Sequence, residues 1–212
     1  VTGVQTCALP ISKEVEIDDV KELLDQMIAC NTAIAQEGMH GDYGANIGKV
    51  IAIRKDLPSL LKAYAAAGSD ARMNGCELPV VINSGSGNQG LTVSVPLIVY
   101  AEREHLDKEK LYRALVISNL TAIHLKTEIG RLSAFCGAVS AGAACGAGLA
   151  YLKDASEEVM NHTIVNALAI TSGIICDGAK ASCAAKIAVS VEAGILGYDM
   201  YMNGQQFYGG DG

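Results

Sequence analysis

The sequence predicts a mainly α fold built as one compact helical unit, and three observations support this prediction. Apolar residues recur at spacings of three and four along most of the chain. Hydrophobic residues make up 50% of the 212 residues, enough to bury the core of a domain. No internal repeat and no linker divides the sequence. We therefore expect one helical domain.

The two ends of the chain differ from the rest. Residues 1–12 (VTGVQTCALPIS) lack the cationic and apolar regions of a signal peptide and are similar to translated sequencing-adapter sequence. The last residues, GQQFYGGDG, supply no closing element. We therefore expect a non-native segment over 1–12 and a helical domain over 13–212 that is truncated at both ends.

The first predicted helix begins at the acidic pair Asp18-Asp19. Its apolar stripe consists of Val20, Leu23, Leu24, Met27, Ile28 and Ile34. Three glycines between residues 38 and 44 break this period and precede a second helical stretch. A third helix is predicted from Pro58 to Gly68, because proline suits the first turn of a helix and glycine suits its end.

The rest of the chain predicts five further helices. Helices over 97–104 and 108–130 are separated by a turn at 105–108, and two more cover 157–175 and 183–202. Between them, residues 132–152 carry no charge, which raises the question of a membrane span. Their Ala, Gly, Ser and Cys content instead favours a buried core helix in close contact with its neighbours.

Charge and cysteine usage narrow the class of partner. The formal net charge is −7, and without a basic stripe we expect neither a nucleic-acid partner nor an anionic membrane surface. The seven cysteines include no C-x-x-C pair, which fits a reducing compartment better than a disulfide framework. We therefore expect a cytoplasmic protein with a small-molecule substrate, and homo-oligomerisation stays open.

A glycine-rich segment, VVINSGSGNQGLTV over 80–93, matches G-x-G-x-x-G through Gly85, Gly87 and Gly90. A dinucleotide fingerprint needs a helix directly after the glycines and an acidic residue about twenty positions on. Here the β-branched LTVSVP follows and leads into Pro96, and Glu102 comes too early. Two alternatives are a plain glycine turn and a backbone nest that binds a carboxylate.

Three cysteines offer a second candidate site. Cys176 and Cys183 are the first and last residues of CDGAKASC, and Cys136 lies forty residues earlier on the small-residue helix. Buried cysteines are commonly small hydrophobes. In one straight helix over 176–183 the two sulfurs would lie about 10 Å apart along the axis, whereas a turn at Asp177-Gly178 would bring them together. Three thiolates suit a cubane iron–sulfur cluster with one open iron better than a zinc site, which takes four ligands.

Four motifs, SDARMNG, NSGSGNQG, IHLKTEIGRLSAFCG and GIICDGAKASCAAK, give the chain its family resemblance. With them the chain resembles the L-cysteine desulfidase family, which is related to the α-domain of iron–sulfur L-serine dehydratases. The likeness covers 13–212 and implies a serine-dehydratase-alpha-like helical domain. It implies a lyase that needs no pyridoxal phosphate and converts L-cysteine to pyruvate, ammonia and sulfide by α,β-elimination. It also implies a [4Fe-4S] cluster on Cys136, Cys176 and Cys183, with one iron left for the substrate.

The remaining candidate residues surround this centre. The glycine segment would bind the substrate carboxylate through five residues: Asn83, Ser84, Gly85, Ser86 and Asn88. His124 and Lys126 are catalytic candidates, with a satisfied core histidine and a snorkelling lysine as the alternatives. Arg72 is a further carboxylate ligand or else part of a surface salt bridge. Asp177 and Lys180 would support the cysteine ligands.

Members of the family also carry an N-terminal half with a Cys-Thr-Glu-Pro motif, and nothing in this sequence matches it. We therefore expect the chain to keep the cluster ligands but to be inactive or weakly active alone. Two alternative functions stay open. One is an L-serine ammonia-lyase, which differs only in the leaving group, and the other is a non-catalytic helical binding domain with buried cysteines.

Overall fold

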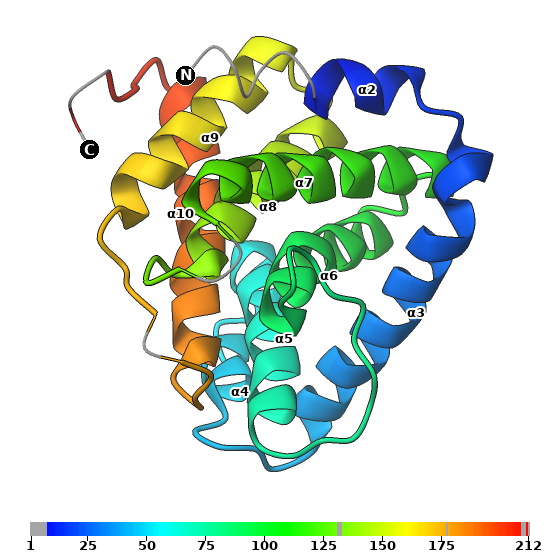
Figure 1. The fold of residues 1–212 in the computed structure, drawn as a ribbon, viewed down its shortest axis with the longest axis vertical. Helices are drawn as coiled ribbons and strands as arrows, with labels where there is room; N and C mark the ends of the chain where they lie inside the picture. The colour runs from blue at the N-terminus through cyan, green and yellow to red at the C-terminus, as the bar shows by residue number, and fades with distance from the viewer. Residues whose placement is uncertain (1–7, 131–132, 177, 209–210, 212) are drawn as a thin grey trace.

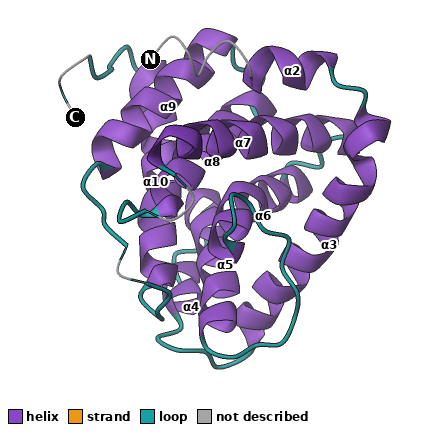
Figure 2. Ribbon diagram, viewed as in Figure 1, coloured by secondary structure: helices purple, strands orange, loops and turns teal. Residues whose placement is uncertain are grey.

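The structure is a computed structural model that describes residues 8–130, 133–176, 178–208 and 211. Every regular element in these ranges is an α-helix (Figures 1 and 2), so the predicted mainly α fold is confirmed. In chain order the helices are α2 (Ala8–Glu14), α3 (Ile17–His40), α4 (Ile47–Ala52), α5 (Leu57–Met73), α6 (Gly87–Arg103), α7 (Lys108–Ile129), α8 (Gly137–Leu152), α9 (Glu157–Thr171) and α10 (Cys183–Met202).

Acidic side chains start two of the long helices. Asp56 accepts a hydrogen bond from the Ser59 N–H at 2.8 Å at the start of α5. Asp107 accepts one from the Glu109 N–H at 3.1 Å at the start of α7. Each bond satisfies an N–H group that the first turn of a helix leaves free. The turn predicted over 105–108 is confirmed, since α6 ends just before it and α7 begins at Lys108.

Helix α8 lies at the centre of the bundle, with α6, α7, α9 and α10 packed around it (Figure 1). A Cβ built on Gly142 would lie 2.3 Å from the Ser190 carbonyl oxygen, and one on Gly146 would lie 2.8 Å from the Gly194 Cα. Protein interiors are close-packed, so the α8–α10 contact has no room for larger side chains. The part of the uncharged segment in α8, from Gly137 to Leu152, is thus a buried core helix, as its composition predicts. None of the described helices is long and apolar enough to cross a lipid bilayer.

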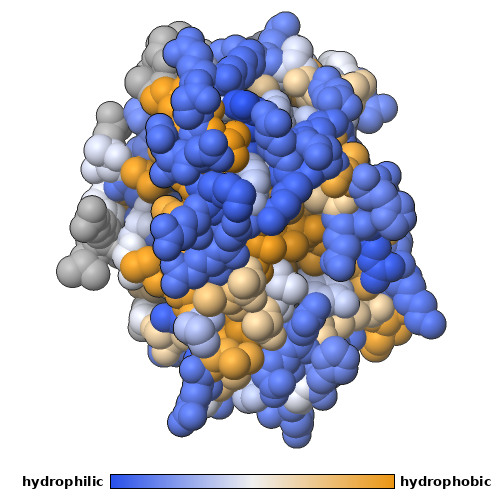
Figure 3. All heavy atoms as spheres, turned by 90° about the vertical axis from the view of Figure 1, so that its right-hand side faces the viewer, coloured by the Kyte–Doolittle hydropathy of each residue, from blue (hydrophilic) through white to orange (hydrophobic). Residues whose placement is uncertain are grey.

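Helix α3 forms one edge of the molecule and packs on α5 (Figure 1). Of its predicted apolar stripe, Leu24, Met27 and Ile34 are at most 4% exposed, Val20 and Ile28 are half-buried, and Leu23 is 55% exposed. Hydrophilic side chains cover most of the face on which α3 lies, and apolar atoms are visible between them (Figure 3). The first predicted helix is therefore confirmed as an amphipathic surface helix.

The glycine predicted to end the third helix lies inside it instead. Helix α5 runs past Gly68 to Met73. A Cβ on Gly68 would lie 3.1 Å from the Leu91 Cδ2, so this glycine serves the contact between α5 and α6. A glycine can allow close packing inside a helix as well as end one, and Gly68 is present for the packing.

Helix α6 also differs from the prediction, because it begins at Gly87 rather than at residue 97 and includes Pro96. Ser86 caps it, accepting a hydrogen bond from the Gln89 N–H at 3.4 Å. Nearly every residue from Gly87 to Val99 is buried. Tertiary burial therefore outweighs the low helix propensity of the β-branched stretch.

Candidate functional site

The glycine segment forms a tight turn directly before α6. Asn83 and Ser86 exchange two backbone hydrogen bonds of 3.1 and 3.0 Å, and Ser84 and Gly85 between them have φ angles of 47° and 82°. Positive φ at both central positions is typical of a type I′ turn. The Asn83 side chain donates to the Asn119 Oδ1 at 2.9 Å, which fixes the turn to α7.

This turn leads into a helix, as a dinucleotide fingerprint requires, so one of the sequence arguments against that interpretation is wrong. A dinucleotide fold also needs a parallel sheet. Within the described ranges the only β-type pairings are two isolated antiparallel bridges. The dinucleotide interpretation therefore fails on the sheet and not on the helix.

Arg72 reaches the start of α6 from the last turn of α5. Its Nη1 donates to the Asn88 Oδ1 at 3.3 Å and to the Met73 sulfur at 3.9 Å. A Cβ on Gly87 would lie 2.4 Å from the Arg72 Nε, so this glycine makes room for the guanidinium. Among the described residues these bonds are not to a carboxylate, and the surface salt bridge considered from the sequence is not formed.

Two segments far apart in the sequence bring Cys136 and Cys176 to the same cavity. Phe135 and Ile175 form an antiparallel bridge, held by backbone hydrogen bonds of 3.0 and 2.6 Å that the two cysteine N–H groups donate. Successive side chains of an extended chain point to opposite faces. Phe135 and Ile175 are 59% and 62% exposed on the outer face, and both cysteines line a cavity on the inner face.

Cys183 joins the other two cysteines from the start of α10. The Lys180 N–H donates to the Cys183 Sγ at 3.5 Å, and Gly178, with a φ of 108°, turns the chain before the helix. The straight-helix alternative for 176–183 is thus wrong. Asp177, the other half of the predicted turn signal and a predicted supporting residue, lies outside the described residues.

These segments line an open cavity of about 330 Å³, the site cavity. Most of the predicted site residues line it: Arg72, Ser84, Gly85, Ser86, Asn88, Lys126, Cys136, Cys176 and Cys183. Asn83 lies just behind the turn and holds it to α7. His124 is half-buried on α7 and is absent from the lining. The structure therefore brings the glycine turn, the three cysteines and Lys126 together, but not His124.

The site cavity favours anions although the chain as a whole is acidic. Three helices begin at it, with Ser86 before α6, Cys136 before α8 and Cys183 at the start of α10. Each helix start carries a partial positive charge. Three cationic side chains, Arg72, Lys126 and Lys186, are in the lining, and no carboxylate is among its described members.

Burial raises the pKa of the Cys136 thiol above its ordinary value, and the neighbouring Cys176 and Cys183 act in the same direction. The Ala138 N–H and the Lys186 ammonium oppose this shift. Burial alone raises the pKa of Cys145, which lies in the core away from the site cavity. Cys136 thus has cationic and thiol neighbours, and in this it differs from Cys145.

The three thiols of the site cavity are the kind of ligand that holds an iron–sulfur cluster. Among the described residues, no three His, Cys, Asp or Glu side chains are close enough to hold one ion. A zinc ion draws its thiolates to about 2.3 Å, whereas a cluster spreads its thiolates over several irons. Cys136, Cys176 and Cys183 line one cavity, so the fold gathers three thiols in the same place.

Gln89 is a site residue that the sequence reasoning missed. It follows the helix cap in the pattern Ser86-x-x-Gln89, which is typical of a capping box. Here the Ser86 N–H already donates to the Asn83 carbonyl oxygen at 3.0 Å, so the Gln89 side chain is not needed as a cap. It is 5% exposed, and it lines the site cavity. The capping pattern hides this role, because it gives the side chain an ordinary structural explanation.

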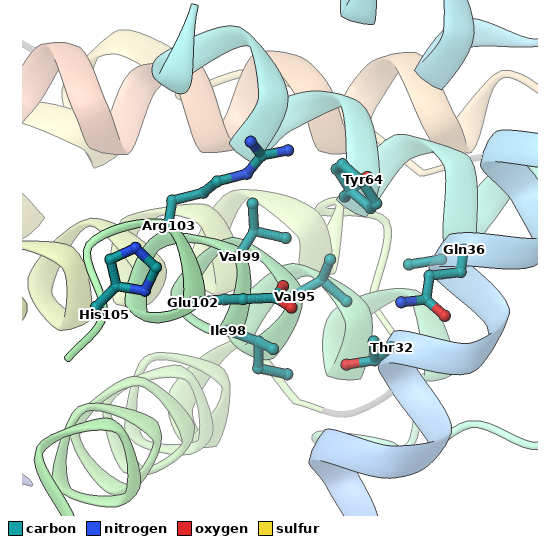
Figure 4. A pocket seen from close by; sticks show the side chains of 10 residues that line it. Thr32, Gln36, Tyr64, Val95, Ile98, Val99, Glu102, Arg103 and His105 are labelled. Atoms are coloured by element: carbon teal, nitrogen blue, oxygen red, sulfur yellow. The ribbon is translucent and has the colours of Figure 1, made fainter. Parts of the chain in front are cut away.

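A second cavity, of about 460 Å³, lies between α3, α5 and α6 (Figure 4). Thr32 and Gln36 reach it from α3, Tyr64 from α5, and Glu102 and Arg103 from the end of α6 (Figure 4). Its charged residues are exposed, and they include a carboxylate. None of the predicted site residues is among its described lining residues.

Comparison with known proteins gives consistent matches. The family model described as serine dehydratase alpha chain matches residues 5–210. A UPF0597 protein of Desulfitobacterium hafniense is 62% identical over 206 residues, which are 96% of this chain and 48% of that protein. A UPF0597 protein of Lachnoclostridium phytofermentans is 53% identical and one of Fusobacterium nucleatum 45% identical, each match covering at least 95% of this chain and 49% of the relative. The chain thus spans about half the length of the curated relatives it matches. No solved structure matches it.

Proposed function

Because this chain belongs to the serine dehydratase alpha chain family, we propose that it is the cluster-binding part of an iron–sulfur lyase that eliminates sulfide from L-cysteine. The products are pyruvate and ammonia together with sulfide. One observation carries the proposal: three cysteines from separate segments line the same cavity as the glycine turn, together with three cationic side chains and, among the described lining residues, no carboxylate. A purely structural helical domain has no use for this combination of groups.

Cys136, Cys176 and Cys183 would hold a [4Fe-4S] cluster. When bound, it supplies a Lewis acid that stabilises the departing thiolate. Cys145 is fully buried in the core and takes no part. The proposed cluster ligands and the proposed carboxylate-binding groups line the same cavity, so one small amino acid could contact both.

The chain's own groups bind the substrate carboxylate. Arg72 offers its guanidinium, and the turn at Ser84–Gly85 together with the start of α6 offers N–H groups fixed by the fold. Loss of the Cα proton moves negative charge onto the carboxylate. Fixed donors and cations there therefore stabilise the transition state more than the ground state.

Lys126 supplies a cation from the α7 side. It is 4% exposed, lines the site cavity and is in none of the ion pairs formed among the described residues. An unpaired buried ammonium is costly unless a ligand supplies the opposite charge. We assign Lys126 to the substrate carboxylate, and we assign no role to His124.

L-serine is the second candidate substrate, favoured by the description of the matching family as serine dehydratase alpha chain. The two substrates share the carboxylate and ammonium groups and differ in the atom that leaves. The same residues would therefore bind both. Relative turnover of L-cysteine and L-serine by a protein of the full length of the relatives decides between them.

Iron binding tests the proposal directly. After anaerobic reconstitution we expect about four iron and four sulfide ions per chain. Cys136→Ala should lose most of this iron, because one of three protein ligands is gone. Cys145→Ala, the matched control, should keep it. Iron-free wild-type protein, or equal iron loss in both variants, would refute the cluster assignment.

Activity is measured separately from iron. Pyruvate release from L-cysteine is compared for this chain and for a protein of full length, each reconstituted. We expect the full-length protein to be active and Cys136→Ala to lower its turnover by at least a hundredfold, a loss of about 2.7 kcal/mol in transition-state stabilisation. A full-length protein that carries the cluster and eliminates neither substrate would contradict the lyase assignment.

A further inference from the structure

We propose that the Gln89 side-chain oxygen accepts a hydrogen bond from the α-ammonium group of the substrate. This inference rests on the proposed lyase function and goes beyond it. It makes Gln89 the residue by which the cavity distinguishes an amino acid from a carboxylic acid that lacks the amino group.

The first observation is an unsatisfied oxygen. Gln89 is 5% exposed, and its Oε1 has no hydrogen-bond partner among the described residues. A buried acceptor without a partner costs about 1–3 kcal/mol. The same side chain lines the site cavity. A ligand that donates to this oxygen would recover the cost, whereas the folded chain alone does not.

The second observation is the scarcity of other acceptors. No carboxylate is among the described lining residues, and three cations are. The Asn88 Oδ1 already accepts from Arg72 at 3.3 Å, and the Ser86 Oγ accepts from the Gln89 N–H at 3.4 Å. An ammonium group has three N–H donors, each of which needs an acceptor. Among the side-chain amide oxygens of the described lining, Gln89 alone offers one without a partner.

The third observation is how the side chain is held. A Cβ on Gly137 would lie 2.4 Å from the Gln89 Nε2 and 2.5 Å from its Cδ. Gly137 directly follows Cys136, so the amide group lies against the start of α8, beside a proposed cluster ligand. An ammonium bonded there would lie near Cys136, while the turn and Arg72 are left for the carboxylate. The position of Gln89 therefore orients the substrate as well as recognising it.

The test uses two ligands that cannot undergo elimination. L-Alanine carries carboxylate and ammonium groups, and propionate carries the carboxylate alone. Their affinities for the iron-reconstituted protein are measured by ligand-observed NMR titration. We expect the wild-type protein to bind L-alanine more tightly than propionate. Gln89→Leu should weaken L-alanine binding by about tenfold or more, the range for hydrogen bonds to charged groups, and should leave propionate binding within about twofold.

Two further variants keep the result interpretable. Gln89→Glu retains an acceptor, so it should bind L-alanine better than Gln89→Leu does and should weaken propionate binding through its added negative charge. Gln36→Leu, at the second cavity, is the matched control and should leave both ligands unaffected. The thermal midpoint of Gln89→Leu should equal or exceed that of the wild type, because the unsatisfied oxygen is gone.

The inference would be overturned if Gln89→Leu weakened the binding of L-alanine and of propionate to the same extent, or if it left L-alanine binding unchanged. A wild-type protein that does not bind L-alanine more tightly than propionate would also overturn it. Pyruvate release is scored independently. If Gln89 controls L-alanine binding but the full-length protein eliminates neither L-cysteine nor L-serine, the proposed function fails while the ammonium site stands.

Discussion

The site cavity, of about 330 Å³, is smaller than the second cavity, of about 460 Å³. The smaller one contains the candidate chemistry. It has three cysteines and a buried lysine, whereas exposed charges of both signs surround the larger one (Figure 4). Volume therefore does not identify the functional cavity. The type and burial of the lining groups do.

One helix links the two cavities and shows why they differ. Helix α6 begins at the site cavity with Ser86 and Gln89 and ends at the second cavity with Glu102 and Arg103. The positive end of its dipole therefore faces the site cavity, and the negative end faces the second cavity. An anionic substrate group is stabilised at the first position and not at the second.

Paired arginine substitutions give the largest expected difference between the cavities. Arg72→Ala removes a cation that lines the site cavity, and Arg103→Ala removes one that lines the second. We expect Arg72→Ala to weaken propionate binding by about tenfold or more, because a hydrogen bond to a charged group contributes about 1.5–3 kcal/mol. Arg103→Ala should change it by less than about twofold. NMR titration measures both, and equal effects would remove the distinction between the cavities.

The sequence predicts most of the helices because their signals are local. The apolar stripe and acidic start of α3, the turn before α7 and the small-residue pattern of α8 are all recognisable in the sequence. The start of α6 is not, because burial on both sides overrides the β-branched residues between Gly87 and Pro96. Likewise, the sequence does not show whether Gly68 ends a helix or makes room inside it for the Leu91 side chain.

The site is only partly predictable for a related reason. Residue type and family motifs indicate the three cysteines and the glycine turn. Only the folded chain shows that Lys126 faces the cavity while His124, two positions away on α7, does not. Gln89 is missed because its importance depends on an unmade hydrogen bond, which no sequence pattern records.

An unsatisfied oxygen outside both cavities sharpens the comparison. Asp70 lies on α5 between Tyr64 of the second cavity and Arg72 of the site cavity. Its Oδ2 accepts from the Gly48 N–H at 2.9 Å, its Oδ1 has no partner among the described residues, and it lines neither cavity. Burial raises its pKa above the ordinary value of 3.8. Ionised Asp70 therefore costs stability above its folded-state pKa, and this cost disappears as the pH falls below 3.8.

The side chain introduced by Asp70→Asn cannot ionise. We therefore expect the unfolding free energy of this variant to increase relative to that of the wild type as the pH rises from about 4 to 7. The difference should grow by at most about 1.4 kcal/mol per pH unit. Denaturant titrations at several pH values measure this. Asp56→Asn is the control of opposite sign, because the Ser59 N–H lowers the pKa of Asp56. The unfolding free energy of Asp56→Asn should be below that of the wild type at neutral pH, and this difference should become smaller as the pH falls. Altered L-alanine binding by Asp70→Asn would show that unsatisfied oxygens affect the site even from outside it.

Thr32 gives the smallest expected effect and the strictest comparison with Gln89. Its Oγ1 is buried without a partner among the described residues, and it lines the second cavity (Figure 4). Valine has nearly the same shape and removes the unpaired oxygen. Thr32→Val should therefore raise the unfolding free energy by about 1 kcal/mol or leave it unchanged, with L-alanine binding unaffected. Gln89→Leu removes a similar atom but should abolish the preference for L-alanine. If Thr32→Val also weakened L-alanine binding, an unsatisfied oxygen would no longer mark the substrate site, and the contrast between the two cavities would rest on their charges and cysteines alone.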